Sequence, residues 1–241
     1  MIPLHDDNPT ETTPVVTIGI IAACTLVFFY QLTLGPQVGQ QFVYQYGAIP
    51  AVILGQETLP REVMALPASL SLITSMFLHG GFLHLIGNML YLWIFGDNIE
   101  EAMGHVRFIF FYLICGVIAA MSHALSDPAS VSPMIGASGA ISGVLGAYLL
   151  LFPRARVYTL IPLGFFFWRA YIPASIILGL WFLLQILSGT ASVGAAGGGV
   201  AWFAHIGGFL AGMALIGFFK HRSVRFFNPP HRRSARYFSE G

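Results

Sequence analysis

Apolar residues run through this 241-residue chain in six long blocks, separated by polar or glycine-rich stretches. Each block approaches the roughly 20 residues that a helix needs to cross the hydrocarbon of a bilayer. The second and fourth blocks are the shortest or the richest in glycine. The six predicted spans cover residues 14–34, 82–97, 105–125, 138–153, 171–189 and 202–220. The pattern therefore predicts an all-α polytopic membrane protein, a bundle of six transmembrane helices.

Charge is scarce in this sequence. Only 9% of its residues are charged and 56% are hydrophobic, whereas roughly 25% of an ordinary soluble domain is charged. A globular domain with so little charge would be hard to keep in solution. The two cysteines, Cys24 and Cys115, both fall inside predicted spans. We expect them to be packing residues and not a disulfide or a metal-binding pair.

Basic residues are distributed unevenly over the loops. With six spans both termini lie on one side, and that side also receives the second and fourth loops. Ten of the 11 Lys and Arg residues then fall on this side, and only Arg61 on the other. By the positive-inside rule this side is the cytoplasm. No Lys or Arg precedes the first block, so it is not typical of a signal peptide.

The sequence divides into three parts. Residues 1–13 form a cytoplasmic N-terminal tail, 14–220 the six-span domain, and 221–241 a basic cytoplasmic tail that we expect to bind anionic lipid. The first loop, 35–78, is long and apolar and contains four prolines, so we expect it to lie in the membrane interface. The glycine-rich segment 188–200 is expected to be mobile on the outer side.

Polar residues within the spans share one depth. Spans two, four and six all run inward from the outer side, so their first residues lie at the same outer level. These residues are His84 and Asn88, Ser138, and His205. Ionisable groups at membrane depth face the bundle interior and are functional by default.

Two helix faces made of small residues predict that the serine and the last histidine meet. One face carries Ser138, Gly139, Ser142, Gly143 and Gly146, and the other carries His205, Gly208, Ala211 and Gly212. Small residues let helix backbones approach closely in lipid. The Ser138 hydroxyl should therefore lie near the His205 imidazole, as a nucleophile lies near its base. Ser142, one turn below, is expected to bond a backbone carbonyl.

Three strings together resemble the motifs of the rhomboid intramembrane serine proteases of bacterial type. They are GASG at 136–139, AHIGGFLAG at 204–212 and HGGFLHLIGN at 79–88, and FGDNIEEAMGH after span two is similar to the family's second loop. The resemblance covers residues 14–220. The family often has a basic residue where Ala102 and Met103 stand here, and a Trp-Arg pair that the first loop lacks.

The resemblance implies a rhomboid-like bundle in which Ser138 attacks a peptide carbonyl and His205 transfers the proton. Because the motifs hold no carboxylate, it implies a dyad whose imidazole is held only by helix packing. The glycines expected to pack the helices are Gly136, Gly139, Gly143, Gly208 and Gly212. The oxyanion donors would be the side chains of His84 and Asn88 and the Ser138 backbone N–H.

The resemblance also implies the partners. The substrate would be a transmembrane protein cut near its outer boundary, in a bacterial plasma membrane, and the other partner is membrane lipid. We expect no nucleic acid, no cofactor and no metal. Segment 188–200 would cap the site, and span five, with Trp181 and Phe182, would be the side through which a substrate helix arrives.

Other classes of protein stay open. A rhomboid-like protein without catalysis would bind or chaperone membrane segments, although the presence of both Ser138 and His205 argues against it. A metal or haem protein could use the four histidines His79, His84, His123 and His205. The H-E-x-x-H spacing of zinc hydrolases is absent, however, and Asn and Ser are poor zinc ligands. The broken helices and midplane charges of a transporter are not visible either.

Four further polar residues are expected to be structural. His79 and His123 should bond backbone groups near the ends of spans two and three. Glu100 and Glu101 lie on the cytoplasmic side, too far from the outer layer for acid–base work, and should bond backbone and neighbouring spans.

Overall fold

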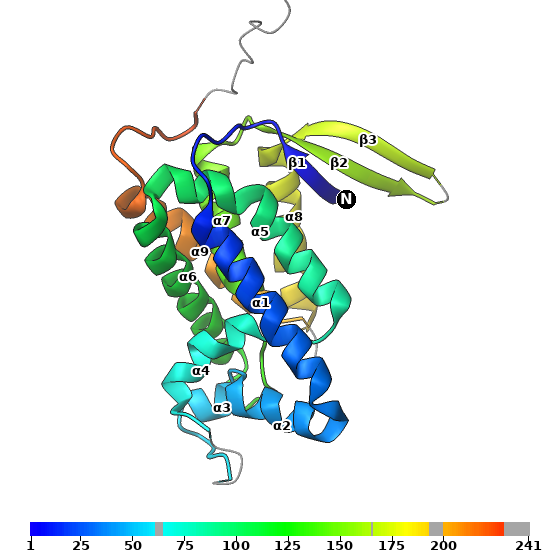
Figure 1. The fold of residues 1–241 in the computed structure, drawn as a ribbon, viewed down its shortest axis with the longest axis vertical. Helices are drawn as coiled ribbons and strands as arrows, with labels where there is room; N and C mark the ends of the chain where they lie inside the picture. The colour runs from blue at the N-terminus through cyan, green and yellow to red at the C-terminus, as the bar shows by residue number, and fades with distance from the viewer. Residues whose placement is uncertain (61–64, 165, 193–199, 229–241) are drawn as a thin grey trace, which may run out of the picture.

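The structure, a computed structural model, describes residues 1–60, 65–164, 166–192 and 200–228. It is a bundle of helices with a small sheet at one end (Figure 1). The long helices are α1 (Val15–Thr33), α5 (Phe82–Met103), α6 (His105–Ser126), α7 (Ser138–Leu151), α8 (Ala174–Ser192) and α9 (Trp202–Phe219). The described residues between α1 and α5 form four short helices, α2 (Gly35–Tyr46), α3 (Pro50–Ile53), α4 (Ala68–Thr74) and the 3-10 helix η1 (Ser75–Phe77).

Within the described residues, four helices are long and apolar enough to cross a membrane, namely α1, α6, α8 and α9. The α4–η1 segment and α5 would together make a fifth span, bent by 85°. Helix α7 is also apolar but has only 14 residues. The prediction of a multi-pass helical membrane protein is confirmed, while the count of six spans stays a prediction.

Helix α7 lies at the centre of the bundle. Every residue from Gly139 to Tyr148 is buried, and the helix packs on α9, α6 and α5. Its small residues allow this close approach. A Cβ atom on Gly208 would collide with the Gly139 carbonyl, and one on Gly212 with the Gly143 carbonyl. The two faces of small residues therefore meet as the sequence predicts.

The acidic residues that end α5 tie the N-terminal segment to the bundle. The carboxylate of Glu100 is fully buried and accepts hydrogen bonds from the Val16 and Thr17 backbone N–H groups at the start of α1, at 2.9 and 2.8 Å. It thereby caps the first turn of that helix, whose N–H groups have no partners within the helix. Glu101 accepts from the backbone N–H groups of Glu11 and Thr12. The structural roles expected for both glutamates are confirmed.

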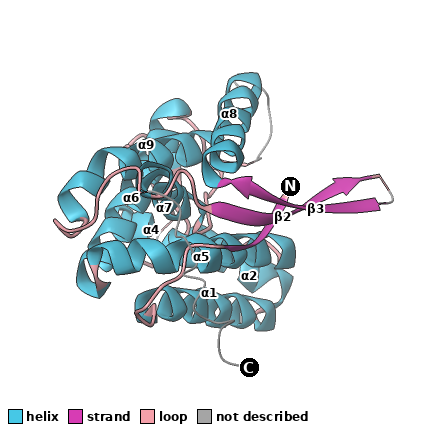
Figure 2. Ribbon diagram, turned by 90° about the horizontal axis from the view of Figure 1, so that it is seen from above, coloured by secondary structure: helices cyan, strands magenta, loops and turns pink. Residues whose placement is uncertain are grey.

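A three-stranded antiparallel sheet covers the same end of the bundle. Strand β1 (Ile2–Asp6) pairs with β2 (Arg156–Leu163), which pairs with β3 (Phe166–Pro173). Seen from that end, the sheet lies between α5 and α8 (Figure 2). The hydropathy pattern did not indicate these strands: the tail 1–13 and the loop after span four contain them, and β3 overlaps the predicted start of span five.

Strand β1 is fastened to the core through Asp6, whose carboxylate accepts a hydrogen bond from the Tyr148 hydroxyl of α7. Burial raises the pKa of Asp6 from 3.8 to about 7, because a carboxylate loses hydration there. At the other end of the sheet, the side chains of Phe166, Phe167 and Trp168 are exposed. Tryptophan is one of the residue types enriched where proteins meet the membrane interface.

The predicted basic tail 221–241 is described only as far as Asn228. Its first residues cross the end of the bundle, where the N–H groups of His221, Phe227 and Asn228 donate to the carbonyls of Ala102, Leu150 and Leu151. The remaining residues of that tail, and residues 61–64 of the first loop, lie outside the described part of the chain.

Candidate functional site

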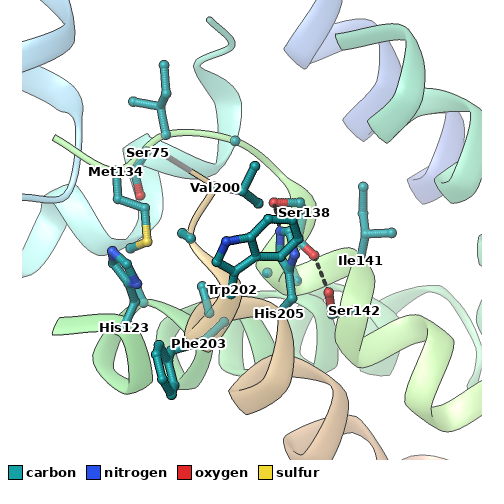
Figure 3. Close-up of a pocket in the computed structure, with 18 of the residues that line it drawn as sticks. Ser75, His123, Met134, Ser138, Ile141, Ser142, Val200, Trp202, Phe203 and His205 are labelled. Carbon is teal, nitrogen blue, oxygen red and sulfur yellow. Dashed lines mark hydrogen bonds between the residues drawn. The ribbon is translucent and has the colours of Figure 1, made fainter. Parts of the chain in front are cut away.

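A cavity of about 1110 Å³ opens at the end of the bundle opposite the sheet. It lies at the N-terminal ends of α5, α7 and α9, which run in the same direction, as predicted. Its lining includes His84 and Asn88 from α5, His123 from α6, Ser138 from α7, Trp181 from α8 and His205 from α9. Four polar residues that the sequence placed at one depth therefore meet in one cavity. Figure 3 shows two of them, Ser138 and His205, side by side.

Ser138 and His205 are joined by a hydrogen bond. Ser138 is the first residue of α7, and His205 lies in the first turn of α9. The Ser138 Oγ and His205 Nε2 atoms are 2.8 Å apart. The close contact of the glycines below brings these first turns together. This is the distance at which a hydroxyl nucleophile passes its proton to a base.

The imidazole has a second partner that the sequence reasoning missed. Its Nδ1 atom lies 2.8 Å from the Oε1 atom of Gln185 in α8, a residue that is only 6% exposed. The Gln185 Nε2 atom donates to the Trp181 carbonyl at 3.1 Å. The prediction that helix packing alone holds the imidazole is therefore wrong. One signal was available, because Gln185 is a polar residue inside an apolar predicted span.

Two indole rings also lie close to the imidazole. The ring of Trp181 is 5.9 Å from that of His205, and the ring of Trp202 is 6.2 Å away and nearly perpendicular. Figure 3 shows Trp202 beside the pair. These bulky side chains limit the rotation of the histidine.

His84, Asn88 and Gly136 form one cluster beside Ser138. Gly136 has a φ of +121°, a conformation that L side chains rarely adopt. A Cβ atom there would lie 2.6 Å from His84 Nε2 and 3.5 Å from Asn88 Nδ2. The glycine therefore leaves room for two side chains that can donate hydrogen bonds. Asn88 Nδ2 is buried and has no hydrogen-bond partner among the described residues.

A backbone donor lies next to this cluster. Ser138 begins α7, and the first N–H groups of a helix have no intrahelical acceptors. The N–H of Gly136 is already used, because it donates to the Ser75 carbonyl at 2.8 Å. The N–H of Ser138 and the side chains of His84 and Asn88 are thus available as donors on this side of the cavity.

Of the residues expected to be structural, some make the predicted contacts and one does not. Ser142 donates to the Ser138 carbonyl at 2.6 Å, as predicted (Figure 3), and His79 Nδ1 lies 3.3 Å from the Phe77 carbonyl, also as predicted. His123 differs: its Nδ1 atom is buried and finds no partner in the described part of the chain. Cys24 and Cys115 are both free and buried.

No three His, Cys, Asp or Glu side chains are grouped as metal ligands within residues 1–60, 65–164, 166–192 and 200–228. The four histidines that a metal protein would need are thus not arranged around one point there. The cavity contains a serine, an imidazole and neutral hydrogen-bond donors, which are the groups that nucleophilic acyl transfer uses.

The fold and the cavity define a multi-pass helical membrane protein with a hydrogen-bonded serine and histidine at the ends of two packed helices. Residues 67–222 match the family model described as Rhomboid domain. The chain belongs to the rhomboid family.

Named relatives agree with this assignment. The chain is 32% identical over 162 residues to Rhomboid protein 1, mitochondrial, of Saccharomyces cerevisiae, which covers 65% of this chain and 43% of that protein. It is 29% identical over 202 residues to Rhomboid protease GluP of Bacillus subtilis, covering 84% of this chain and 35% of that protein. The chain thus spans less than half the length of either relative.

Proposed function

We propose that this protein is an intramembrane serine endopeptidase that cleaves transmembrane segments of membrane proteins near their extracytoplasmic boundary. The observation that carries the proposal is the 2.8 Å hydrogen bond between Ser138 Oγ and His205 Nε2 on the wall of a large cavity. Family membership supports it, because some relatives are named rhomboid proteases.

The reaction proceeds by acyl transfer. Ser138 Oγ attacks the substrate carbonyl while its proton passes to His205 Nε2. The imidazolium then gives that proton to the leaving amine, and an acyl-enzyme remains. A water molecule, activated by the same nitrogen, hydrolyses the ester and releases Ser138.

The negative charge of the tetrahedral intermediate needs preorganised donors. We assign this role to the His84 and Asn88 side chains beside Gly136 and to the Ser138 backbone N–H. The unpartnered Nδ2 atom of Asn88 supports the assignment, since it is buried in the bundle without an acceptor from the described residues. Removing one such donor costs about 3 kcal/mol, or roughly a hundredfold in rate.

The orientation in the membrane decides where cleavage occurs. With both termini in the cytoplasm, the sheet lies on the cytoplasmic side and the cavity opens outward, where water for hydrolysis is available. We further propose that a substrate helix arrives between α5 and α8, because the cavity is lined by Tyr91 of α5 and Trp181 of α8. The outer face of α8 is apolar and exposed, as lipid contact requires. The bacterial plasma membrane is the proposed location.

The predicted cap, 188–200, lies largely outside the described residues, since 193–199 are not described. Its two ends are the last turn of α8 and the residues that lead into α9, where Val200 and Trp202 line the cavity.

A cleavage assay tests the proposal. The purified protein is reconstituted in liposomes with a fluorogenic transmembrane peptide, with and without EDTA, together with Ser138→Ala, His205→Ala and the control Ser142→Ala. We expect cleavage that resists EDTA, is lost in the first two variants and persists in the control. Cleavage by Ser138→Ala, or its loss in EDTA, would contradict the mechanism. No cleavage of any peptide would favour a non-catalytic protein that binds membrane segments.

A further inference from the structure

We propose that Gln185 of α8 is a positioning residue that fixes the tautomer and the orientation of His205. The site is then a Ser–His–Gln triad without a charged member. This inference rests on the proposed function, and it adds to the serine and histidine a residue from a third helix.

The hydrogen bonds determine which atom donates at each step. The Trp181 carbonyl can only accept, so the Gln185 atom that faces it at 3.1 Å is the amide nitrogen. The Oε1 atom is therefore the one that faces His205 Nδ1 at 2.8 Å, and it can only accept. Nδ1 must carry the imidazole proton. Nε2 is left with a lone pair, which accepts the proton of the Ser138 hydroxyl.

An amide suits this place better than a carboxylate. Gln185 is buried in a span, where an ionised carboxylate would be costly to hold. A neutral acceptor still selects the tautomer and directs the ring, which is the role of the orienting group in a catalytic triad. It stabilises the imidazolium less than a carboxylate does.

The position of Gln185 also links the base to α8. Ser138 and His205 lie on α7 and α9, which are packed backbone to backbone, whereas the third group comes from a helix with a weaker contact to α7. If α8 moves away to admit a substrate, the bond from His205 Nδ1 to Gln185 breaks. The base regains its orientation only when α8 returns.

Two substitutions at this position separate orientation from packing. Gln185→Met keeps the length of the side chain but removes the acceptor. Gln185→Glu keeps the acceptor and adds a charge. The matched control is Gln31→Met in α1, since Gln31 also makes two hydrogen bonds, with the backbone N–H and the carbonyl of His79, away from the cavity lining.

The readouts are kcat, KM and the pH dependence of kcat/KM for a transmembrane peptide in liposomes. We expect Gln185→Met to lower kcat by about 100-fold, the lower part of the range for positioned acid–base catalysis, with KM changed less than twofold. Gln31→Met should leave kcat unchanged. In Gln185→Glu the acidic limb should move upward by about 1–3 pH units, because a carboxylate stabilises the protonated imidazole.

Other titratable side chains that face the cavity are His84 and Tyr91 from α5, His123 from α6 and Asp127 after it. All variants share them, so a displaced limb in Gln185→Glu alone reports the contact with His205. The shift of the acidic limb in Gln185→Glu still tests the inference if Gln185→Met does not fold.

The inference is overturned if Gln185→Met retains kcat within twofold of the wild type, or if the profile of Gln185→Glu coincides with that of the wild type. A failure of the proposed function looks different. In that case the wild type does not cleave the peptide, or Ser138→Ala cleaves it as well as the wild type does.

Discussion

The contact between α7 and α9 gives the sharpest prediction about how the site is built. In Gly212→Ala the new Cβ atom would lie 2.5 Å from the carbonyl carbon and 2.6 Å from the Cα of Gly143. These are backbone atoms in the middle of a helix, so no side-chain rotation relieves the overlap. Ordinary contact begins at 3.4 Å, and the two helices must therefore separate.

The magnitude follows from that separation. Moving the Gly143 carbonyl carbon from 2.5 Å to an ordinary contact needs roughly 1 Å, and the carbonyl oxygen, which lies closer still, needs more; overpacking of this kind costs about 1–3 kcal/mol of unfolding free energy. His205 lies two turns before Gly212 on the same helix. A displacement of roughly 1 Å between Ser138 and His205 can lower the rate about a hundredfold.

The assay is denaturant unfolding of the detergent-solubilised protein, followed by the cleavage rate in liposomes. The matched control is Gly179→Ala in α8, because a Cβ atom there has nothing within 4 Å. It should retain both stability and rate. If Gly212→Ala unfolds within about 0.5 kcal/mol of the control and cleaves as fast, backbone contact between the helices does not position the site.

Two further predictions concern pH and access. The folded pKa of Asp6, about 7, lies above its ordinary 3.8, so the stabilisation from its protonated form is fully present below pH 4 and is lost as the pH rises through 7. Asp6→Asn should therefore be more stable than the wild type at pH 8, measured by thermal unfolding, and an equal difference at pH 4 would contradict this reasoning. A Cβ atom on Gly189 would lie 3.3 Å from the Trp202 Cβ, close to disulfide geometry. Oxidised Gly189→Cys/Trp202→Cys should cleave a transmembrane substrate at least about tenfold more slowly than when reduced, and equal rates would mean that the end of α8 does not have to move.

Much of the bundle could be predicted because lipid restricts the chain to few solutions. Apolar blocks of near-spanning length mark the helices, and loop charges give a consistent direction. The meeting of Ser138 with His205 followed from glycines at helical spacing on both sides of the contact. These signals are local, periodic and independent of side-chain detail.

The sheet was missed for a physical reason. Strand β2 (RVYTLIPL) is rich in β-branched and aromatic residues and ends near Gly164, which together form a hairpin signal. In a chain where most apolar runs are spans, however, this run is too short to be a span, and the hydropathy pattern predicts a loop before span five. Strand β1 is short and includes His5 and Asp6, and it is ordered by long-range contacts that the sequence does not reveal, among them its pairing with β2 and the Asp6–Tyr148 hydrogen bond.

The partner of Gln185 could not be identified from the sequence, because His205 lies 20 residues away on another helix. A glutamine in a span has many ways to satisfy its amide, and sequence spacing does not reveal which imidazole lies within reach. The distance between α8 and α9 depends on packing of large side chains such as Phe182 against Phe209, whose stacked rings are 4.3 Å apart.

The most direct test of the central claim is to locate the nucleophile chemically. The purified protein is treated with a fluorophosphonate, which phosphonylates an activated serine with loss of fluoride, and the modified peptide is identified by mass spectrometry. The account predicts a single adduct on Ser138 that is lost in His205→Ala and retained in Ser142→Ala. An adduct on another serine, or equal labelling of Ser138 without His205, would contradict it.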